Sequence, residues 1–417
     1  MTVVIVGGGQ AGLSMSYCLK QRGIEHLVLE RHHVGHEWRT ARWDSFCLVT
    51  PNWQCQLPGF GYDGDDPDGF MTRDEIIDYV ERYADSFDPP LREGVAVSAL
   101  RRDEHGGFDL ETTDGAIRAD QVVIATGGYH VPRIPRFAAA LPTGIEQLHS
   151  SQYRNPSELP DGDVLVIGTG QSGCQIAEDL HLEGRRVHLC VGGATRTARF
   201  YRGRDVVAWL DDLGYYDLPV HEHKLGADVR EKANQYVTGR DGGRDIDLRG
   251  FAREGMRLYG RLAGLLYGTA LSLAPDLAHN LDAADAASEK IKDTIDGHIA
   301  EQEIDAPVEP RYEPVWQPGI EPKELELSGS KIGSIVWCTG FDSDYSWVDL
   351  PAFDGRARPV HARGVTGVPG LYVVGLPWLY TWGSGRFSGI ARDVEYLADL
   401  VEPGQGAAPV AALARRA

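Results

Sequence analysis

The chain has 417 residues, which is enough for two domains, and its apolar content of 42% is ordinary for a globular protein. Its 41 Lys and Arg residues against 61 Asp and Glu residues give a net charge of −20, which disfavours binding to nucleic acid or to an anionic membrane surface. The six cysteines are scattered and include no CxxC pair, which argues against a disulfide framework, a zinc ribbon and a dithiol redox centre. We therefore expect a cytoplasmic protein with reduced thiols, no nucleic-acid partner and no membrane insertion.

Two nearly identical segments occur in the sequence. The stretch VVIVGGGQAGLSMSYCLKQRGIEHLVLE starts at Val3, and VLVIGTGQSGCQIAEDLHLEGRRVHLCV starts at Val164. Each contains a β-branched run, a glycine-rich turn, a segment with helical spacing and a second β-branched run, which is typical of the βαβ unit of a parallel sheet. The glycines correspond in pairs: Gly7 with Gly168, Gly9 with Gly170, and Gly12 with Gly173. The repeat predicts two Rossmann-like halves.

The first glycine turn is predicted to bind a dinucleotide. A helix N-terminus stabilises a pyrophosphate when no side chain blocks its approach. Glu30 ends the following strand, where a carboxylate accepts hydrogen bonds from both ribose hydroxyls of FAD or NAD. We assign this unit to FAD, with the predicted contacts Gly7, Gly9, Gln10, Ala11, Gly12, Glu30 and Arg31.

The second glycine turn is predicted to bind NADPH. Val191 stands where the first copy has its acid, so no carboxylate repels a 2'-phosphate, and arginines follow in TRTARFYRGR. The predicted NADPH contacts are Gly168, Gly170, Gln171, Ser172, Gly173, Arg196 and Arg199. A solvated basic loop is the alternative for these arginines.

The remaining segments suggest how the halves are connected. A helix is predicted from Thr72, which forms a capping box with Glu75, and short antiparallel strands follow it up to a buried strand at 122–126. The phrase SIVWCTGF from Ser334 repeats the end of that strand, so we expect the chain to return there to the first domain. The apolar run from Leu258 is expected to form a buried helix, and the tail after about residue 402 to be poorly ordered.

These observations predict an α/β fold with two Rossmann-like dinucleotide-binding domains, the NADPH domain being inserted in the FAD domain. The FAD domain is expected to comprise residues 1–155 and 325–417, and the NADPH domain residues 156–324, with a helical insertion at about 201–317.

The motifs GGGQAG, EWR, LPGF, ATGGYHVPRIP, HSSQYR and GTGQSG, in this order, resemble the class B flavin-containing monooxygenases over nearly the whole chain. This family includes plant indole-pyruvate monooxygenases and bacterial flavoproteins associated with cation transport. The resemblance implies that the flavin lies between the two domains, with His149 in the hinge. Further predicted FAD contacts are Trp38, Arg39, Val97, Ala125, Thr126, Gly127, Gly375 and Ser384.

The activity that the resemblance implies is an NADPH-dependent flavoprotein monooxygenase, which uses the flavin C4a-(hydro)peroxide to oxygenate a small organic substrate with O2. Nitrogen-containing compounds are one candidate class. The predicted substrate-side and flavin-pocket residues are Asn52, Trp53, Gln54 and Trp382. Two alternatives stay open: an FAD-dependent NADPH:acceptor oxidoreductase without oxygen insertion, and a non-catalytic redox sensor. No metal is expected, because His221 and His223 lack a third ligand, and a homodimer is one arrangement that we consider.

Overall fold

The fold contains two parallel sheets, shown by the computed structural model, which describes residues 2–401. The tail predicted to be poorly ordered lies outside this range. The first sheet has the strand order β22-β23-β24-β9-β1-β2-β5, and its five strands from β24 to β5 are parallel. The bounds are β22 His361–Ala362, β23 Val365–Thr366, β24 Leu371–Val373, β9 Gln121–Ile124, β1 Val3–Val6, β2 His26–Leu29 and β5 Leu91–Arg92.

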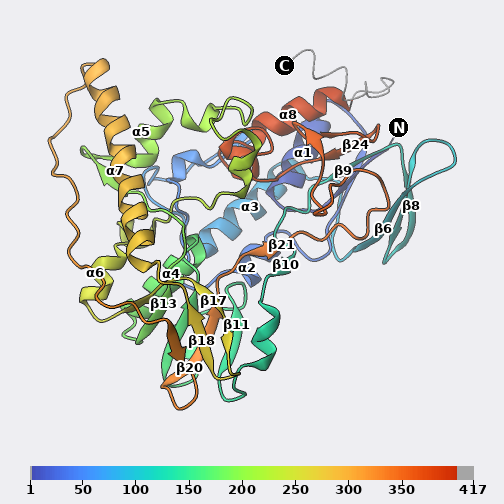
Figure 1. The fold of residues 1–417 in the computed structure, drawn as a ribbon. Helices are drawn as coiled ribbons and strands as arrows, with labels where there is room; N and C mark the ends of the chain where they lie inside the picture. The colour runs from blue at the N-terminus through green and yellow to red at the C-terminus, as the bar shows by residue number, and fades with distance from the viewer. Residues whose placement is uncertain (1, 402–417) are drawn as a thin grey trace.

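The second sheet repeats this arrangement with five parallel strands in the order β11-β20-β12-β13-β16. Their bounds are β11 Glu146–His149, β20 Ile332–Trp337, β12 Asp163–Ile167, β13 Val187–Cys190 and β16 Arg257–Tyr259. In Figure 1 the first sheet lies at the right and the second at the lower centre. The α/β fold predicted from the repeat is confirmed.

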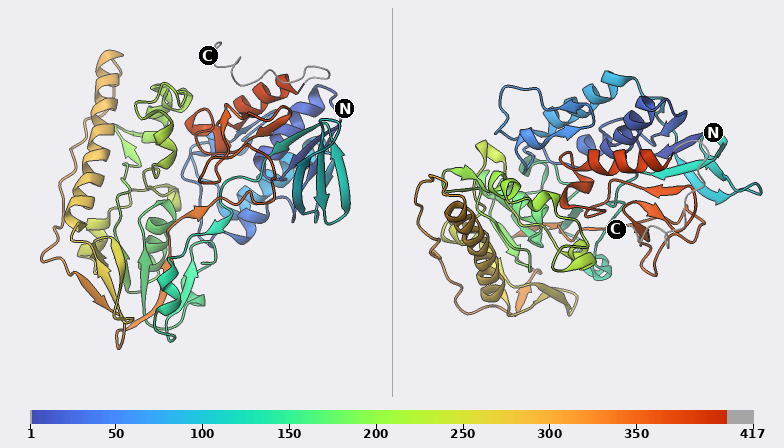
Figure 2. Two further views of the ribbon diagram at one scale, coloured as in Figure 1. Left: turned by 45° about the vertical axis from the view of Figure 1, so that its right-hand side comes forward. Right: turned by 90° about the horizontal axis from the view of Figure 1, so that it is seen from above.

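Eight α-helices accompany the sheets within residues 2–401. They are α1 Gln10–Gln21, α2 His36–Thr40, α3 Arg73–Phe87, α4 Gln171–Leu182, α5 Val206–Asp212, α6 Leu248–Arg253, α7 Leu277–Glu301 and α8 Ile390–Leu400. The predicted capping box of α3 is present, since Thr72 accepts from the Glu75 backbone N–H and the Glu75 carboxylate accepts from that of Thr72. The long helix α7 stands at the outer edge of the second half in both views of Figure 2.

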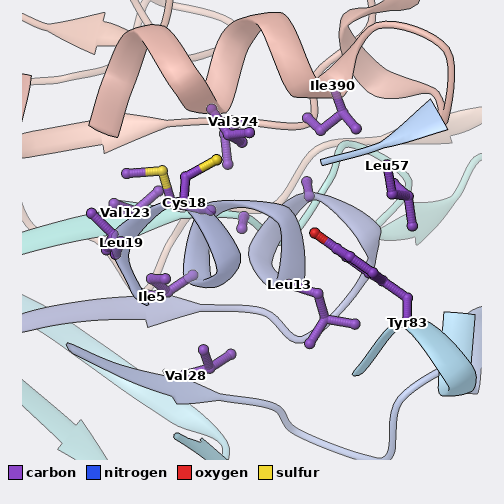
Figure 3. Packing of buried hydrophobic residues seen from close by; sticks show 14 of the residues in the cluster. Ile5, Leu13, Cys18, Leu19, Val28, Leu57, Tyr83, Val123, Val374 and Ile390 are labelled. Carbon is purple, nitrogen blue, oxygen red and sulfur yellow. The ribbon is translucent and has the colours of Figure 1, made fainter. Parts of the chain in front are cut away.

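The core of the first half is built around α1. Figure 3 shows Leu13 and Leu19 of α1 between the first sheet, represented by Ile5, and α8, represented by Ile390. All four side chains are fully buried, and each such burial stabilises the fold by about 1.5–3 kcal/mol. This packing fixes the start of α1 at the carboxyl end of β1, which is the position that a phosphate-binding turn requires.

Small antiparallel sheets complete the structure. Their strands are β3 Gln56–Leu57 with β4 Phe60–Gly61, β6 Val97–Arg102 with β7 Phe108–Thr112 and β8 Gly115–Ala119, β10 Val131–Pro132 with β21 Phe341–Asp342, β14 Phe200–Tyr201 with β15 Arg204–Asp205, and β17 Leu262–Leu266 with β18 Ala270–Leu273 and β19 Glu324–Glu326. The pair β10 and β21 joins the two crossing segments between the large sheets.

The strand pairing corrects the predicted domain limits. Both β11 and β20 pair in the second sheet, although they fall outside the predicted range 156–324. The Thr-Gly phrase at 339–340 therefore follows a strand of the second sheet, and the chain crosses back toward the first half directly after it, through β21. The strand before this phrase, β20, lies beside the glycine-turn strand β12, just as β9, which precedes residues 125–127, lies beside the glycine-turn strand β1.

The apolar run from Leu258 is not a helix. It forms β16, β17 and β18, and the turn between the last two has positive φ at Tyr267 (52°) and Gly268 (76°). A Cβ at Gly260 would lie 1.9 Å from the Ala274 carbonyl oxygen, so this glycine permits a close approach of two chain segments. The predicted helical insertion at 201–317 consequently contains strands as well as α5, α6 and α7.

Candidate dinucleotide and flavin site

The first glycine turn is shaped by its neighbours. Gly7 has φ +112°, and a Cβ there would lie 2.6 Å from the Ala125 carbonyl oxygen at the end of β9. A Cβ at Gly12 would lie 1.9 Å from the Gly7 carbonyl oxygen, so α1 can begin against the turn only without a side chain. In front of Gly9 nothing lies within 4 Å of an added Cβ. The turn is thus closed behind and open in front, as a backbone cradle for phosphate requires.

Glu30 is held at the predicted place beside this turn. Its carboxylate accepts hydrogen bonds from the backbone N–H groups of Gly8 at 2.6 Å and His32 at 2.8 Å. A Cβ at Gly8 would lie 2.8 Å from that of Glu30, so the second glycine of the run allows the acid to lie close to the turn. The carboxylate therefore stands at the end of β2 in a fixed orientation.

The second turn repeats the first in each contact. Gly168 has φ +104°, and a Cβ there would lie 2.6 Å from the Cys338 carbonyl oxygen. A Cβ at Gly173 would lie 2.0 Å from the Gly168 carbonyl oxygen, and nothing lies within 4 Å in front of Gly170. Cys338 thus plays the part that Ala125 plays in the first turn. The sequence signal for it was the repeated Thr-Gly phrase.

Matched glutamines follow the two turns and hold loops from distant parts of the chain. The side-chain amide of Gln10 donates to the Gly385 carbonyl oxygen at 3.5 Å, and that of Gln171 donates to the Val237 carbonyl oxygen. Ser172, the next residue of α4, is partly exposed. Each cradle is therefore bordered by a loop that the repeat alone did not reveal.

The arginines predicted to hold a 2'-phosphate form salt bridges with aspartates of the chain instead. Arg196 is 3% exposed and its Nε donates to Asp285 at 2.7 Å, while its guanidinium lies 4.0 Å over the Tyr312 ring. Arg199 is 1% exposed and pairs with Asp205 at 2.5 Å. Because both side chains are interior and neutralised by aspartates, the structure does not support them as phosphate ligands.

The two cradles flank the crossing between the sheets. β9 leads through Gly127 to β10, β20 leads through Gly340 to β21, and these two short strands pair antiparallel. His149 is fully buried here, with its Nε2 3.0 Å from the Gly340 carbonyl oxygen and its Nδ1 3.0 Å from the Ser151 hydroxyl. It lies at the end of β11 beside the crossing, and its role as a hinge stays a prediction.

Of the predicted flavin-side residues after β2, Trp38 belongs to an aromatic wall. Trp38 stacks on Phe387, with ring centroids 5.8 Å apart, and its neighbour Arg39 points away to Glu81 at 2.5 Å. Arg31 is exposed and lies 3.9 Å from Glu37. Of these side chains, only that of Trp38 faces the interior.

Val97 begins β6 and packs against the buried cluster that contains Val6 and Leu29. Its neighbour by two residues, Val95, makes the contact with the acid strand, because its N–H donates to the Glu30 carbonyl oxygen at 2.9 Å. Nothing in the sequence had singled out Val95.

The loop after β24 closes over the first cradle. A Cβ at Gly375 would lie 2.6 Å from that of Ala11 on α1, so this loop touches the start of the helix. Ser384 is fully buried, and its hydroxyl accepts from the N–H groups of Tyr380 and Thr381, both at 2.9 Å. Its own N–H donates to the Thr381 carbonyl oxygen. These hydrogen bonds of Ser384 shape the loop itself, and its contact with the flavin stays a prediction.

Asp393 of α8 is buried beneath this loop, with 1% of its surface exposed. Burial raises the pKa of this carboxyl from 3.8 to about 6, against the opposing effects of the Ser384 hydroxyl and the Arg363 charge. Since the folded-state pKa lies above the unfolded one, the free energy of unfolding should fall as the pH rises from about 4 to about 6.

Asp393→Asn should therefore increase the free energy of unfolding at pH 8 by about 2–3 kcal/mol and leave it nearly unchanged at pH 4. Urea unfolding at the two pH values measures this difference. Asp399→Asn, at an exposed position of the same helix, serves as the control. An equal gain at both pH values would show that ionisation of Asp393 is not the cause.

Two of the predicted substrate-side residues are buried. Asn52 is 4% exposed, donates from Nδ2 to the Asp66 carbonyl oxygen at 2.9 Å and accepts from the Met71 N–H at 2.7 Å. It therefore fixes the loop at 66–71, and its place beside a substrate stays a prediction. Gln54 is 3% exposed, and Trp53 between them is half-buried.

Trp382 lies where the chain excursion at 214–231 meets the loop after β24. Its ring centroid is 4.6 Å from that of Tyr216 and 3.8 Å from the Arg386 guanidinium carbon. His221 and His223 belong to the same excursion, and their rings contact Tyr380 and Trp378. Within residues 2–401 no three His, Cys, Asp or Glu side chains are placed to hold a metal ion.

The cysteines lie in apolar surroundings. Burial raises the pKa of Cys47 to about 11 and those of Cys18, Cys55 and Cys190 to about 12. It also raises the thiol pKa values of Cys174 and Cys338. No thiolate nucleophile is therefore available near neutral pH. The helices within residues 2–401 include none long and apolar enough to span a membrane.

The residues present fit two dinucleotides. Both turns leave open space before a helix N-terminus, and a Cβ at either of their rear glycines would clash with the backbone behind. Only the first turn has a carboxylate, that of Glu30, at the end of its second strand. The fold and site therefore define an oxidoreductase that binds two dinucleotides.

Comparison with known proteins agrees with this class. A family model described as pyridine nucleotide-disulphide oxidoreductase matches residues 4–213. An uncharacterized CzcO-like oxidoreductase of Geobacillus kaustophilus is 34% identical over 401 residues, covering 95% of this chain and 96% of the relative. Indole-3-pyruvate monooxygenase YUCCA1 of Oryza sativa subsp. japonica is 31% identical over 191 residues, covering 45% of this chain and 47% of the relative.

Among solved structures, a flavin monooxygenase mutant from Stenotrophomonas maltophilia has a TM-score of 0.66 at 19% identity and covers 96% of this chain and 97% of that chain. The chain belongs to the pyridine nucleotide-disulphide oxidoreductase family, and over part of its length it is similar to flavin monooxygenases. It is an oxidoreductase of a family whose cofactors are FAD and NADPH.

Proposed function

We propose that the protein is an NADPH-dependent flavoprotein monooxygenase that transfers one oxygen atom from O2 to a small organic substrate. The observation that carries the proposal is the pair of matched glycine cradles on either side of the β10–β21 crossing. Residues 7–12 with Glu30 would hold FAD, and residues 168–173 would hold NADPH. Bound FAD, once reduced by NADPH, supplies the chemistry that activates O2.

The strand pairing suggests revised domains for this arrangement. The FAD domain would comprise the residues before β11 and those from β21 onward, and the NADPH domain would extend from β11 to β20. A location in the cytoplasm, a homodimer and nitrogen-containing substrates stay predictions.

The chain's own groups would bind and orient the nucleotides and exclude water from the site. Backbone N–H groups of the two turns bind pyrophosphates, and the Glu30 carboxylate is free to accept from ribose hydroxyls beyond its two backbone contacts. The aromatic wall at Trp38 and the loop at Trp382 shield the space next to the first cradle from solvent. No side-chain acid–base pair is required for this role.

The second candidate is an NADPH:acceptor oxidoreductase, which the family's disulphide oxidoreductase description favours. A version with a reactive thiol disagrees with the raised pKa values of all six cysteines. A quinone or other small acceptor is compatible with the site.

The two candidates give opposite results when NADPH oxidation is followed with 18O2 and a panel of thioethers, tertiary amines, cyclic ketones and aryl acids. A monooxygenase should place 18O in a product and release less H2O2 than the NADPH it consumes. If every compound leaves all the oxygen as H2O2, while a quinone sustains the same NADPH oxidation under nitrogen, the acceptor oxidoreductase is correct.

A further inference from the structure

The chain excursion at 214–231, which belongs to the second half, binds the loop after β24 through three successive carbonyl oxygens. Arg230 donates from Nε to the carbonyl oxygen of Trp378 at 2.9 Å and from Nη2 to that of Leu379 at 3.2 Å. The Val220 N–H donates to the next carbonyl oxygen along the loop at 2.7 Å. In Figure 1 the yellow-green chain that follows α5 lies beside the segment that leads into α8. A segment of one half thus determines where the backbone of a loop in the other half lies.

Trp378 has a strained backbone. Its φ is +52°, in the left-handed region that a bulky residue rarely adopts, and it is 4% exposed. Within residues 2–401 it is the only buried residue other than glycine that has a positive φ. Its ring centroid lies 6.4 Å from that of Tyr215 and 5.2 Å from that of His223, both in the excursion. Strain of this kind persists only where the surroundings hold it, and here they belong to the second half.

The other side of the same loop is attached to the first half. The Gly385 carbonyl oxygen accepts from Gln10 at the start of α1, and the Ser384 hydroxyl accepts from two backbone N–H groups of the loop. A Cβ at Gly385 would lie 3.2 Å from the Gly375 carbonyl oxygen, so the two ends of the loop are packed on each other. A backbone change at Trp378 would therefore displace the contact with α1.

Two ion pairs also join the excursion to the first half, but they lie at the surface. Arg358 pairs with Glu231, and Arg392 pairs with Asp217. Among the residues that the structure describes, the Arg358 side chain bonds only to carboxylates and does not reach the loop backbone. Exposed pairs of this kind contribute little to stability, so they do not account for the conformation of Trp378.

We propose that Arg230 is a positioning residue of the flavin site, which holds Trp378 in its left-handed conformation and thereby keeps the loop after β24 against the first cradle. This inference rests on the proposed function, because that function assigns FAD to the first cradle. A guanidinium is planar and binds two neighbouring carbonyl oxygens at once, which an amide or an ammonium cannot do in the same geometry. The first cradle is therefore covered correctly only while the second half is docked.

The test is hydrogen–deuterium exchange of the peptide at 376–387, followed by mass spectrometry, together with the Kd for FAD. Both the protein as purified and the protein saturated with FAD are used for the exchange. In Arg230→Gln, Trp378 should relax to a negative φ, so the loop amides should exchange about tenfold faster and the Kd for FAD should rise about tenfold. Arg230→Lys should give intermediate values, because the charge stays and the planar fork is lost. Since Arg230 is exposed, both variants should fold, and urea unfolding checks this.

A glycine at the strained position tests the link between the two residues. Glycine adopts a φ of +52° without steric cost, so the loop of Trp378→Gly no longer needs the guanidinium. Adding Arg230→Gln to Trp378→Gly should change the exchange of the loop by less than about twofold, because the two substitutions act on one contact. Arg358→Gln is the matched control, since it breaks an ion pair between the same segments and should leave the exchange and the Kd unchanged.

Unchanged loop exchange in Arg230→Gln would overturn the proposal, as would an equal increase in Arg358→Gln. A full effect of Arg230→Gln in the Trp378→Gly background would also overturn it, because relief of strain would then not be the cause. The exchange of the protein as purified needs neither turnover nor O2, so it separates failure of this inference from failure of the proposed monooxygenase activity.

Discussion

Gly12→Ala is expected to yield protein that does not retain FAD, whereas Gly173→Ala should retain FAD and lose its reduction by NADPH. The added Cβ would lie 1.9 Å and 2.0 Å from the carbonyl oxygens of Gly7 and Gly168, respectively. Because the clashing atom is backbone, the turn itself must move, and its N–H groups leave the pyrophosphate position. We expect each substitution to weaken binding of the nucleotide at its own turn by at least ~100-fold.

The flavin absorbance of the purified proteins and the rate of its bleaching by NADPH without O2 measure the two effects. Gly144→Ala is a suitable control, since an added Cβ there meets nothing within 4 Å and φ is not positive. A Gly173→Ala protein that is colourless but otherwise folded would contradict the assignment of FAD to the first turn.

The double glycine fingerprint was predictable because its constraints are local. The turn, the helix start and the acid at the end of the second strand all lie within 30 residues of one another, and each glycine excludes a named backbone contact. The repeat then predicted the second parallel sheet. The capping box of α3 was predictable for the same reason.

The features that the sequence did not reveal depend on contacts with residues far along the chain. Nothing near Arg196 in sequence reveals that Asp285, 89 residues away, neutralises it, and Asn52 is fixed by a loop that starts 14 residues later. The apolar run at 258 fits a helix or a hairpin equally by composition, and only its glycines and the partner strand β19 decide.

Strand order could not be predicted either. The phrase at 334–341 resembles the end of β9, but resemblance of two strand ends does not say which sheet each one joins. The structure shows that the likeness reflects the repeat, because both strands lie next to a glycine-turn strand and supply the carbonyl that closes it.

Asp179 connects the two halves and should be the most sensitive residue outside the cradles. It lies on α4, is 3% exposed, and accepts hydrogen bonds of 2.6 Å from Ser45 of the first half, from Tyr153 in the segment between β11 and β12, and from Arg240. A cavity of 440 Å³ opens beside this cluster, so no packed side chain can take over its role.

Asp179→Ala is expected to lower the free energy of unfolding by about 3–5 kcal/mol, because it leaves the Arg240 charge and the buried Tyr153 hydroxyl without their partner. Since Ser45 then no longer holds the halves together, bleaching of bound flavin by NADPH should slow about tenfold or more, with FAD still retained. Urea unfolding and anaerobic stopped-flow absorbance measure the two quantities.

Glu183→Gln changes an exposed carboxylate one helical turn further on, 3.6 Å from Arg240, and should alter neither quantity much. Tyr153→Phe removes one of the three hydrogen bonds and keeps the charge pair, so it should fall between the control and Asp179→Ala. If Asp179→Ala unfolds as the wild type does but reduces its flavin slowly, the residue acts on nucleotide binding rather than on the junction. Normal stability with normal reduction would mean that the two halves are held together by other contacts.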